Sequence, residues 1–510
     1  YHDLINDAWK NVLFNQFHDI LPGSGIREIY IDAEEDYKKS FELGNIALNN
    51  SLKNISKNIN TSSINDGKAL IVFNSLSWKR NDVVKIELEL GDKNNYKIYD
   101  IEGNEISSQI IQKDKLRREI IFIATDIPAL GYKTYIIREE KNENTIRTNK
   151  ELKNIFEIEN DFFKVNVNPN TGWVSSIFDK RYNKELIAGE ANKLQLLEDK
   201  PSAWDAWNIG LTGIEYPSKF RKAELIEDGP VRKILRCYHD YLKPGVVKEF
   251  PTEDFPNSFF EQDIILYNGI DRIDFKTDVE WWEDKTMLKV SFPLNVQDTL
   301  ATYEIPFGMI KRSTTLKAQL DKGKWEVNAQ KWADLSDDNF GIALLNKSKY
   351  GYDTKGNIMR LSLLRSPKWP DPTADRGNHS FEYSIYPHQK RVDESQTVHK
   401  GYEFNYPLLY VIEDIHEGSL PIEHSFIQII PGNAILTSVK QSQENSQELI
   451  LTIYESSGKD SECKLTLPFI PKKIYESNFL EENVREVLFE KDTIKFQLKK
   501  NSVKVLKVIL

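Results

Sequence analysis

Residues 15–23, with the sequence Asn-Gln-Phe-His-Asp-Ile-Leu-Pro-Gly, hold the side chains best suited to chemistry. His18 and Asp19 stand side by side where a helical pattern ends, just before a turn rich in Pro, Gly and Ser. An imidazole there can point away from a packed face, and the neighbouring carboxylate can accept hydrogen bonds. The pair suits metal ligation or the binding of sugar hydroxyls. By residue type alone, a structural histidine and a turn-capping aspartate are the more common alternatives.

A second group of candidates is the segment Trp204-Asp205-Ala206-Trp207, far along the chain. Aromatic faces stack on the C–H side of sugars, and a nearby carboxylate binds hydroxyl groups. A glycan-binding loop, with Trp204, Asp205 and Trp207 in contact with substrate, is one interpretation. Two core tryptophans that flank a turn aspartate are an equally good one.

A Pro/Gly-rich loop carries Asp371, Asp375 and Arg376. It could reach the same substrate-binding cleft as the loop of Trp204 and Trp207. Asp375 and Arg376 are therefore further candidates for substrate contact, although an ion pair within the loop explains them as well. His239 lies in an apolar strand context and is expected to be structural. We also expect the tryptophans at 281, 282 and 325 to pack in a β-sandwich core.

Two helices must position the His18 turn. Before the turn, apolar residues recur at helical spacing, namely Leu4, Ala8, Trp9, Val12, Leu13 and Phe17. After it, the same period runs from Ile26 to Ile55 in a long segment with weak caps. Two helices alone cannot bury both apolar stripes well, so we expect a further helix or domain to pack against them.

From about residue 68 the hydrophobic period changes to that of β-strands. Short runs such as residues 69–73, 83–90 and 134–138 alternate with turn clusters. Residues 139–149 are charged and Asn-rich, and they read as a linker. Beyond them, a long all-β region extends to about residue 430, and a final small sandwich follows. The expected architecture is mainly β: a short helical segment, then stacked antiparallel β domains.

Length and composition narrow the class of protein. The chain has 510 residues, 40% of them hydrophobic, which is enough for several cores. Its formal charge of −10 argues against a nucleic-acid partner, and no apolar stretch is long enough to cross a membrane. Two distant cysteines favour a reducing cytoplasm over a disulfide scaffold. The first residues, which lack a Met and enter a helical pattern at once, suggest the later part of a longer protein.

Several segments resemble glycoside hydrolase family 38, the retaining α-mannosidases, in its cytosolic/vacuolar and bacterial branch. They are residues 15–23, 72–80, 280–282, 288–293, 303–308, 332–336, 341–346, 349–353, 363–367, 370–377 and 386–388. The resemblance covers most of the chain. It implies four parts: residues 1–66 from the middle helical domain, 67–140 a small β-sandwich, 141–430 a large galactose-mutarotase-like supersandwich, and 431–510 a C-terminal β-sandwich.

The resemblance also implies a chemistry. Family members cleave terminal α-linked mannose with two carboxyl groups about 5 Å apart, beside a divalent ion that is usually Zn²⁺, with Co²⁺ or Ca²⁺ as alternatives. His18 matches a metal ligand of the family, and Asp19 matches a carboxylate that binds mannose hydroxyls. The family's other metal ligands include a His-x-Asp pair, which does not occur in this sequence. Neither the nucleophile nor the acid can be placed in the chain.

We therefore expect the C-terminal portion of such an enzyme, inactive without its N-terminal catalytic domain. Its partners would be that domain and a mannose-containing oligosaccharide, with a homo-oligomer possible. Two alternatives remain open. One is a non-catalytic carbohydrate-binding β-sandwich protein, and the other is a hydrolase of a small mannoside such as mannosylglycerate.

Overall fold

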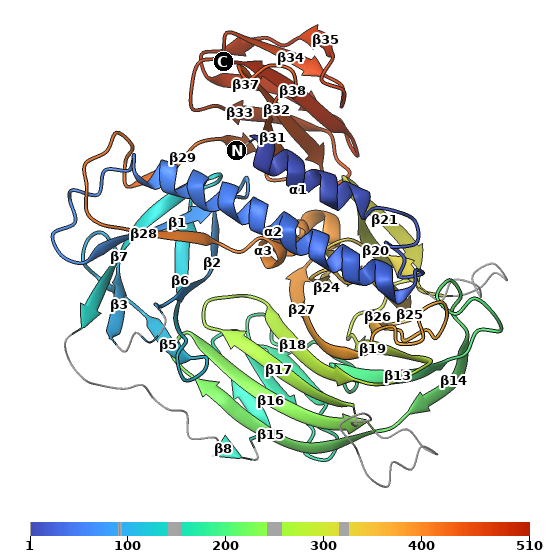
Figure 1. Cartoon of the computed structure of the whole chain (residues 1–510). Coiled ribbons are helices and arrows are strands. Elements are labelled where there is room, and N and C mark those ends of the chain that lie inside the picture. The colour runs from blue at the N-terminus through green and yellow to red at the C-terminus, as the bar shows by residue number, and fades with distance from the viewer. Residues whose placement is uncertain are drawn as a thin grey trace.

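Two helices form the first part of the protein. The computed structural model describes residues 2–89, 91, 94–140, 152–153, 155–241, 258–315 and 326–510. Helix α1 (His2–Phe14) runs beside the longer α2 (Arg27–Ser56), and the Ser40 hydroxyl donates to the Ala8 carbonyl at 3.2 Å (Figure 1). Helix α1 has no buried residue, whereas α2 buries small residues and Leu52. The two predicted helices are confirmed, and α1 keeps its apolar stripe largely exposed.

A small β-sandwich packs under α2. One sheet has the order β28 (Leu409–Glu413), β1 (Lys68–Asn74), β7 (Gly131–Glu140), β3 (Asn95–Tyr99) and β4 (Glu105–Ile106), with β29 (Glu423–Ser425) beside β7. The facing sheet has the order β2 (Arg80–Glu87), β6 (Arg118–Ile127) and β5 (Ser108–Gln112). Leu52 of α2 packs against Ile71, Phe73 and Tyr132 of the first sheet. The Ser56 hydroxyl also donates to Glu413 at 2.5 Å, which ties the end of α2 to β28.

The pairing of β28 and β29 crosses the expected domain boundaries. Strand β1 is buried everywhere except at Lys68, so it needs a hydrogen-bonding neighbour on both edges. Strand β7 supplies one edge and β28 the other, with Leu70 opposite Ile412. Residues 409–425 thus complete the sheet of the 67–140 sandwich, although we had placed them in the large sandwich.

The large sandwich is built from three antiparallel sheets. The first has the order β21 (Gly308–Ser313), β20 (Leu300–Ile305), β23 (Trp332–Ser336), β24 (Phe340–Asn346), β27 (Gly377–Gln389), β18 (Ile273–Trp281), β17 (Phe259–Tyr267), β16 (Arg232–Tyr241), β15 (Ser218–Asp228) and β8 (Leu152–Lys153). The second has the order β14 (Leu211–Tyr216), β13 (Lys193–Asp199), β19 (Thr286–Pro293), β26 (Ile358–Leu364), β25 (Gly351–Lys355) and β22 (Val327–Asn328). The third has the order β12 (Lys184–Glu185), β11 (Val174–Asp179), β10 (Phe163–Val167) and β9 (Glu157–Glu159).

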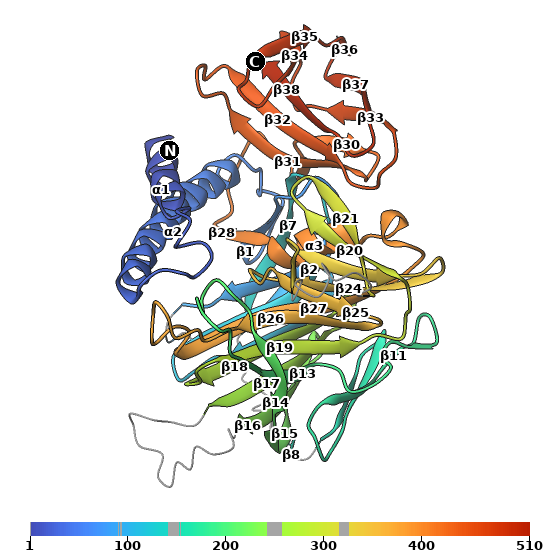
Figure 2. The ribbon, with the colours of Figure 1, turned by 90° about the vertical axis from the view of Figure 1, so that its right-hand side faces the viewer.

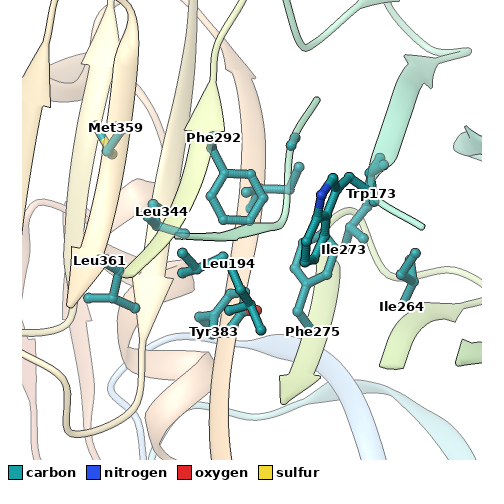
Figure 3. Close-up of a cluster of buried hydrophobic side chains, with 14 of the residues drawn as sticks. Trp173, Leu194, Ile264, Ile273, Phe275, Phe292, Leu344, Met359, Leu361 and Tyr383 are labelled. Carbon is teal, nitrogen blue, oxygen red and sulfur yellow. The ribbon is translucent and has the colours of Figure 1, made fainter. Parts of the chain in front are cut away.

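Side chains from these three sheets share one core. Figure 3 shows Phe275 and Tyr383 from the first sheet facing Phe292 and Leu194 from the second, with Trp173 at the third. Trp281 is fully buried in this core, as expected. Trp332 is also fully buried, in a separate cluster under the short helix α3 (Thr397–Asn405). We had not predicted α3, and Trp325 lies outside the described residues.

The last sandwich stands beside the others, at the top of Figure 1 and Figure 2. One sheet has the order β30 (Gln428–Ile430), β33 (Ser461–Thr466), β37 (Thr493–Leu498) and β36 (Phe489–Glu490). The other has the order β31 (Ala434–Gln441), β32 (Glu448–Glu455), β38 (Val503–Ile509), β34 (Lys473–Ser477) and β35 (Asn483–Glu486). The mainly β, antiparallel architecture is thereby confirmed. No helix in the described part of the chain is long and apolar enough to span a membrane.

His239 is a structural residue of the large sandwich. Its ring stacks on Trp173 with centroids 3.9 Å apart, and Nε2 lies 2.9 Å from the Thr171 carbonyl oxygen. Burial lowers the pKa of His239 to about 4, because the charged imidazolium would lose its hydration. The residue is 1% exposed. It therefore belongs to the core and not to a reactive site.

This burial predicts acid sensitivity. As the pH falls below about 6.5, the unfolded chain gains a proton at His239 that the folded chain does not bind until about pH 4. The free energy of unfolding should therefore fall by about 3 kcal/mol across that range from this group. Urea unfolding at pH 4 to 7 should show this loss in the wild type and not in His239→Gln. Parallel pH profiles for the two proteins would contradict the assignment.

Candidate functional site

The turn that carries His18 is fixed by buried polar contacts. Asn15, which is 1% exposed, donates from Nδ2 to the Asn11 carbonyl at 2.9 Å and to Asp36 of α2 at 3.0 Å. Gly23 has φ = +74°, in the left-handed region that other residues rarely adopt. These features explain why the helix stops here and why the chain can reverse into α2.

The backbone under Asp19 is also held in place. The Tyr30 hydroxyl accepts a hydrogen bond from the Gly25 amide at 2.7 Å and donates one to the Asp19 carbonyl at 3.0 Å. The Ser24 hydroxyl donates to the Asp19 carboxylate at 3.3 Å. A Cβ atom at Gly25 would come within 1.9 Å of Cδ1 of Ile29, so a side chain there would force Ile29 to change its rotamer. These contacts fix the backbone of Asp19 relative to α2.

The side chains of His18 and Asp19 are accessible. His18 is 79% exposed and Asp19 is 37% exposed at the side chain, and Nε2 lies 3.5 Å from Oδ2. The imidazole contacts the ring of Phe17, with centroids 4.3 Å apart. The side chains of this turn therefore lie at the surface of the described part of the chain. An exposed imidazole beside a carboxylate can donate to, accept from or coordinate a ligand.

The described residues do not make a metal centre by themselves. They contain no group of three or more His, Cys, Asp and Glu side chains placed to hold one ion. His18 and Asp19 offer two donors at most, and a zinc site needs three or four. The donor chemistry of His18 fits a zinc ligand, but the number of donors does not complete a site.

A cavity of about 710 Å³ is lined by Asp19 and by Trp207 of the second candidate group, whereas His18 is not part of its lining. It is lined by Phe14, Asn15, Phe17, Asp19, Ile20, Ser24, Gly25, Ile26, Ile29, Asp32, Asp36, Trp207 and Pro370. Asp19 from the helical segment and Trp207 from the large sandwich therefore face one space, although they are far apart in sequence. This volume suits a monosaccharide-sized ligand or larger.

The tryptophans of the second group are surface residues. Trp204 is 59% exposed and Trp207 is 47% exposed, so the interpretation as core residues is wrong. A third indole, Trp369, is 48% exposed and was missed from the sequence. The ring centroids are 5.8 Å apart for Trp204 and Trp207, 4.9 Å for Trp204 and Trp369, and 5.3 Å for Trp207 and Trp369. The signal for Trp369 was its place between Lys368 and Pro370, in the loop already singled out.

The charged candidates contact residues of their own and of neighbouring loops. Asp205 accepts from the Lys368 amide at 3.3 Å and lies 3.8 Å from Nζ of Lys285. Asp375 accepts from the amides of residues 365 and 366 at 3.1 and 2.9 Å. Arg376 donates to both carboxylate oxygens of Asp284, at 2.9 and 3.0 Å.

Asp371 likewise accepts from the amide and hydroxyl of Thr373, at 2.7 and 2.9 Å. The contacts of all these carboxylates, and of Arg376, hold the loops in shape, and none of the four residues lines the cavity around Asp19. Substrate contact by Asp205, Asp375 and Arg376 stays a prediction.

Three family models match this chain. They are "Alpha mannosidase middle domain" at residues 1–55, "Glycosyl hydrolases family 38 C-terminal domain" at 158–373, and "Glycosyl hydrolases family 38 C-terminal beta sandwich domain" at 433–504. The first covers the His18 turn, and the second covers Trp204, Trp207 and Trp369 of the large sandwich. The chain belongs to glycosyl hydrolase family 38.

Curated relatives and a solved structure agree with this family. Alpha-mannosidase 2C1 of Mus musculus is 29% identical over 90% of this chain and 41% of its own length. Alpha-mannosidase of Saccharomyces cerevisiae is 28% identical over 95% of this chain and 41% of its own length. The crystal structure of an alpha-mannosidase from Enterococcus faecalis V583 has the same fold, with a TM-score of 0.80, 17% identity, and coverage of 99% of this chain and 63% of that one. The chain thus spans less than half the length of the two curated relatives.

Proposed function

We propose that this chain is the C-terminal part of a retaining α-mannosidase that removes terminal α-D-mannose from oligosaccharides. The observation that supports the proposal is that Asp19 and Trp207 line one cavity, so a carboxylate and an aromatic ring are available to the same ligand. The names of the curated relatives support the same activity. The acid and the nucleophile of a retaining hydrolase would come from the part of the relatives that this chain does not cover.

The proposed roles follow from the exposed groups. His18 supplies one ligand to a divalent ion, most simply Zn²⁺, whose other ligands lie outside this chain. Asp19 accepts hydrogen bonds from mannose hydroxyls, and Trp204 and Trp207 contact the sugar through its C–H groups. The two buried cysteines, both unpaired thiols, fit a cytoplasmic enzyme.

The exposed face of α1 is the proposed contact for the catalytic domain. Trp9, Leu13, Phe14 and Phe17 are each between 56% and 74% exposed, and they lie on or directly after α1 beside the His18 turn. Exposed apolar side chains gathered at one place usually mark an interaction surface. A catalytic domain seated there would bring its own donors next to His18.

This proposal predicts that residues 1–510 alone and the full-length protein differ in activity. The chain of residues 1–510 alone should not hydrolyse a chromogenic α-mannoside above buffer, even with added zinc, because it lacks the nucleophile. The full-length protein should hydrolyse it, and NMR should show the α-anomer released first. Robust turnover by residues 1–510 alone would place the nucleophile in this chain.

The same assay separates the two alternatives. A full-length protein that binds manno-oligosaccharides in calorimetry but cleaves none would be a carbohydrate-binding protein. A full-length protein that cleaves mannosylglycerate and leaves α-linked mannotriose intact would be a small-mannoside hydrolase. Cleavage of mannotriose with retention supports the function proposed here.

A further inference from the structure

Three tryptophans form an exposed aromatic surface beside the cavity. Trp204, Trp207 and Trp369, here called the tryptophan platform, are about half exposed and have ring centroids within 5.8 Å of one another. Two of them come from one loop and the third from another. Leaving three adjacent indoles in water forgoes a large gain from burial, so such a patch is expected to have a binding role.

The platform is held rigidly by Arg365. Its guanidinium donates from Nε to Asp199 at 2.8 Å, from Nη1 to the Ala206 carbonyl at 3.1 Å, and from Nη2 to the Asn208 carbonyl. These bonds hold the loop that carries Trp204 and Trp207. The Asp375 carboxylate in turn accepts from the Arg365 amide at 3.1 Å, so the brace is itself fixed.

The backbone of the platform is strained as well. Trp204 has φ = +60°, in the left-handed region that non-glycine residues rarely adopt. Strain of this kind persists only where the surrounding structure enforces it, and Arg365 does so here. A pre-organised set of rings loses little conformational entropy when a ligand binds.

The position of the rings defines what they contact. Trp207 lines the cavity that also contains Asp19, whereas Trp204 and Trp369 lie outside that lining. The platform therefore extends from the cavity wall outward. Because Trp207 contacts both Trp204 and Trp369, a ligand that extends past Trp207 out of the cavity can reach the outer rings.

We infer that Trp369 and Trp204 form a subsite for the sugar residues on the leaving-group side of the bond that is cleaved. This inference rests on the proposed function and names its substrate class: α-linked manno-oligosaccharides rather than mannosides with a small aglycone. Sugars present flat C–H faces to indoles, and Lys285, whose side chain is 40% exposed beside Asp205, offers a donor for their hydroxyls.

The test compares two substrates of the full-length protein. α-Mannosyl fluoride has a leaving group too small to reach the platform, and α-linked mannotriose covers it. Trp369→Ala should lower kcat/KM for mannotriose about tenfold more than kcat/KM for the fluoride, mainly through KM. Trp369→Phe, which keeps a ring, should recover most of the loss. Phe479→Ala, which removes an exposed ring of the C-terminal sandwich, is the matched control and should leave the ratio at its wild-type value.

Each outcome decides one of the two proposals. If Trp369→Ala folds normally and lowers kcat/KM equally for both substrates, or for neither, the subsite proposal is wrong while the mannosidase proposal stands. If the wild type cleaves neither substrate, the mannosidase proposal fails. The subsite is then judged by titrating mannotriose and following tryptophan fluorescence. A saturable change in the wild type that Trp369→Ala loses supports the subsite, and the same response in both proteins, or none, overturns it.

Discussion

Replacing His18 by alanine in the full-length protein should lower both metal content and kcat/KM. Loss of an outer partner of a metal ligand typically costs 10–100-fold, so loss of the ligand itself should cost at least about 100-fold. The fold should survive, because the side chain is 79% exposed and supports no core. Three measurements on the same preparation check these expectations. Mass spectrometry gives the metal content, steady-state kinetics give kcat/KM, and the thermal midpoint reports the fold.

Two further variants separate the roles around His18. Asp19→Ala should keep the metal but weaken binding of the transition state by about 1.5–3 kcal/mol, the usual cost of losing a charged acceptor. His2→Ala, a change at an exposed histidine of α1, should match the wild type in both readouts. A His18→Ala protein that holds metal and turns over normally would make His18 a structural residue.

Arg272→Ala should destabilise the protein by about 3–5 kcal/mol, the cost of breaking a buried ion pair from one side. Arg272 is 4% exposed, and it joins Asp82 of the small sandwich at 3.2 Å to Asp274 of the large one at 3.0 Å. Its removal leaves both of these buried carboxylates without this partner. In urea unfolding at neutral pH, the transition of these two sandwiches should have its midpoint at a lower urea concentration than in the wild type.

The matched control is Arg221→Ala. Arg221 also pairs with a carboxylate, that of Asp240, but its side chain is 61% exposed. An exposed pair contributes about 0–1 kcal/mol, so this variant should unfold close to the wild type. Equal unfolding curves for the two variants would mean that the Arg272 contacts add nothing to the junction of the two sandwiches.

Local patterns in the sequence were enough for the elements around the site. The helical period on both sides of His18 predicted α1 and α2, and Pro22 and Gly23 predicted the turn between them. Short β-rich runs between turn clusters predicted strands such as β1 and β7. Residues close together in the sequence determine these features, so they can be predicted from the sequence alone.

Features set by distant contacts could not be predicted. Helix α3 is short and has no side-chain cap, so its sequence carries little helical signal, and packing over Trp332 stabilises it. The return of β28 to the edge of β1 follows from burial of both faces of β1, which no local pattern reports. Trp369 was missed because nothing in its own loop shows that Trp204 and Trp207 lie beside it.

The cavity has one wall on the helical segment and another on the large sandwich, and this makes affinity dependent on how firmly the two are docked. A ligand that contacts Asp19 and Trp207 binds only the docked arrangement. At a free ligand concentration a hundredfold above Kd, it stabilises that arrangement by about 2.7 kcal/mol. The linkage also works in reverse. A change at the hydrogen bond between Ser56 and Glu413, remote from the cavity, can weaken binding without removing any contact with the ligand.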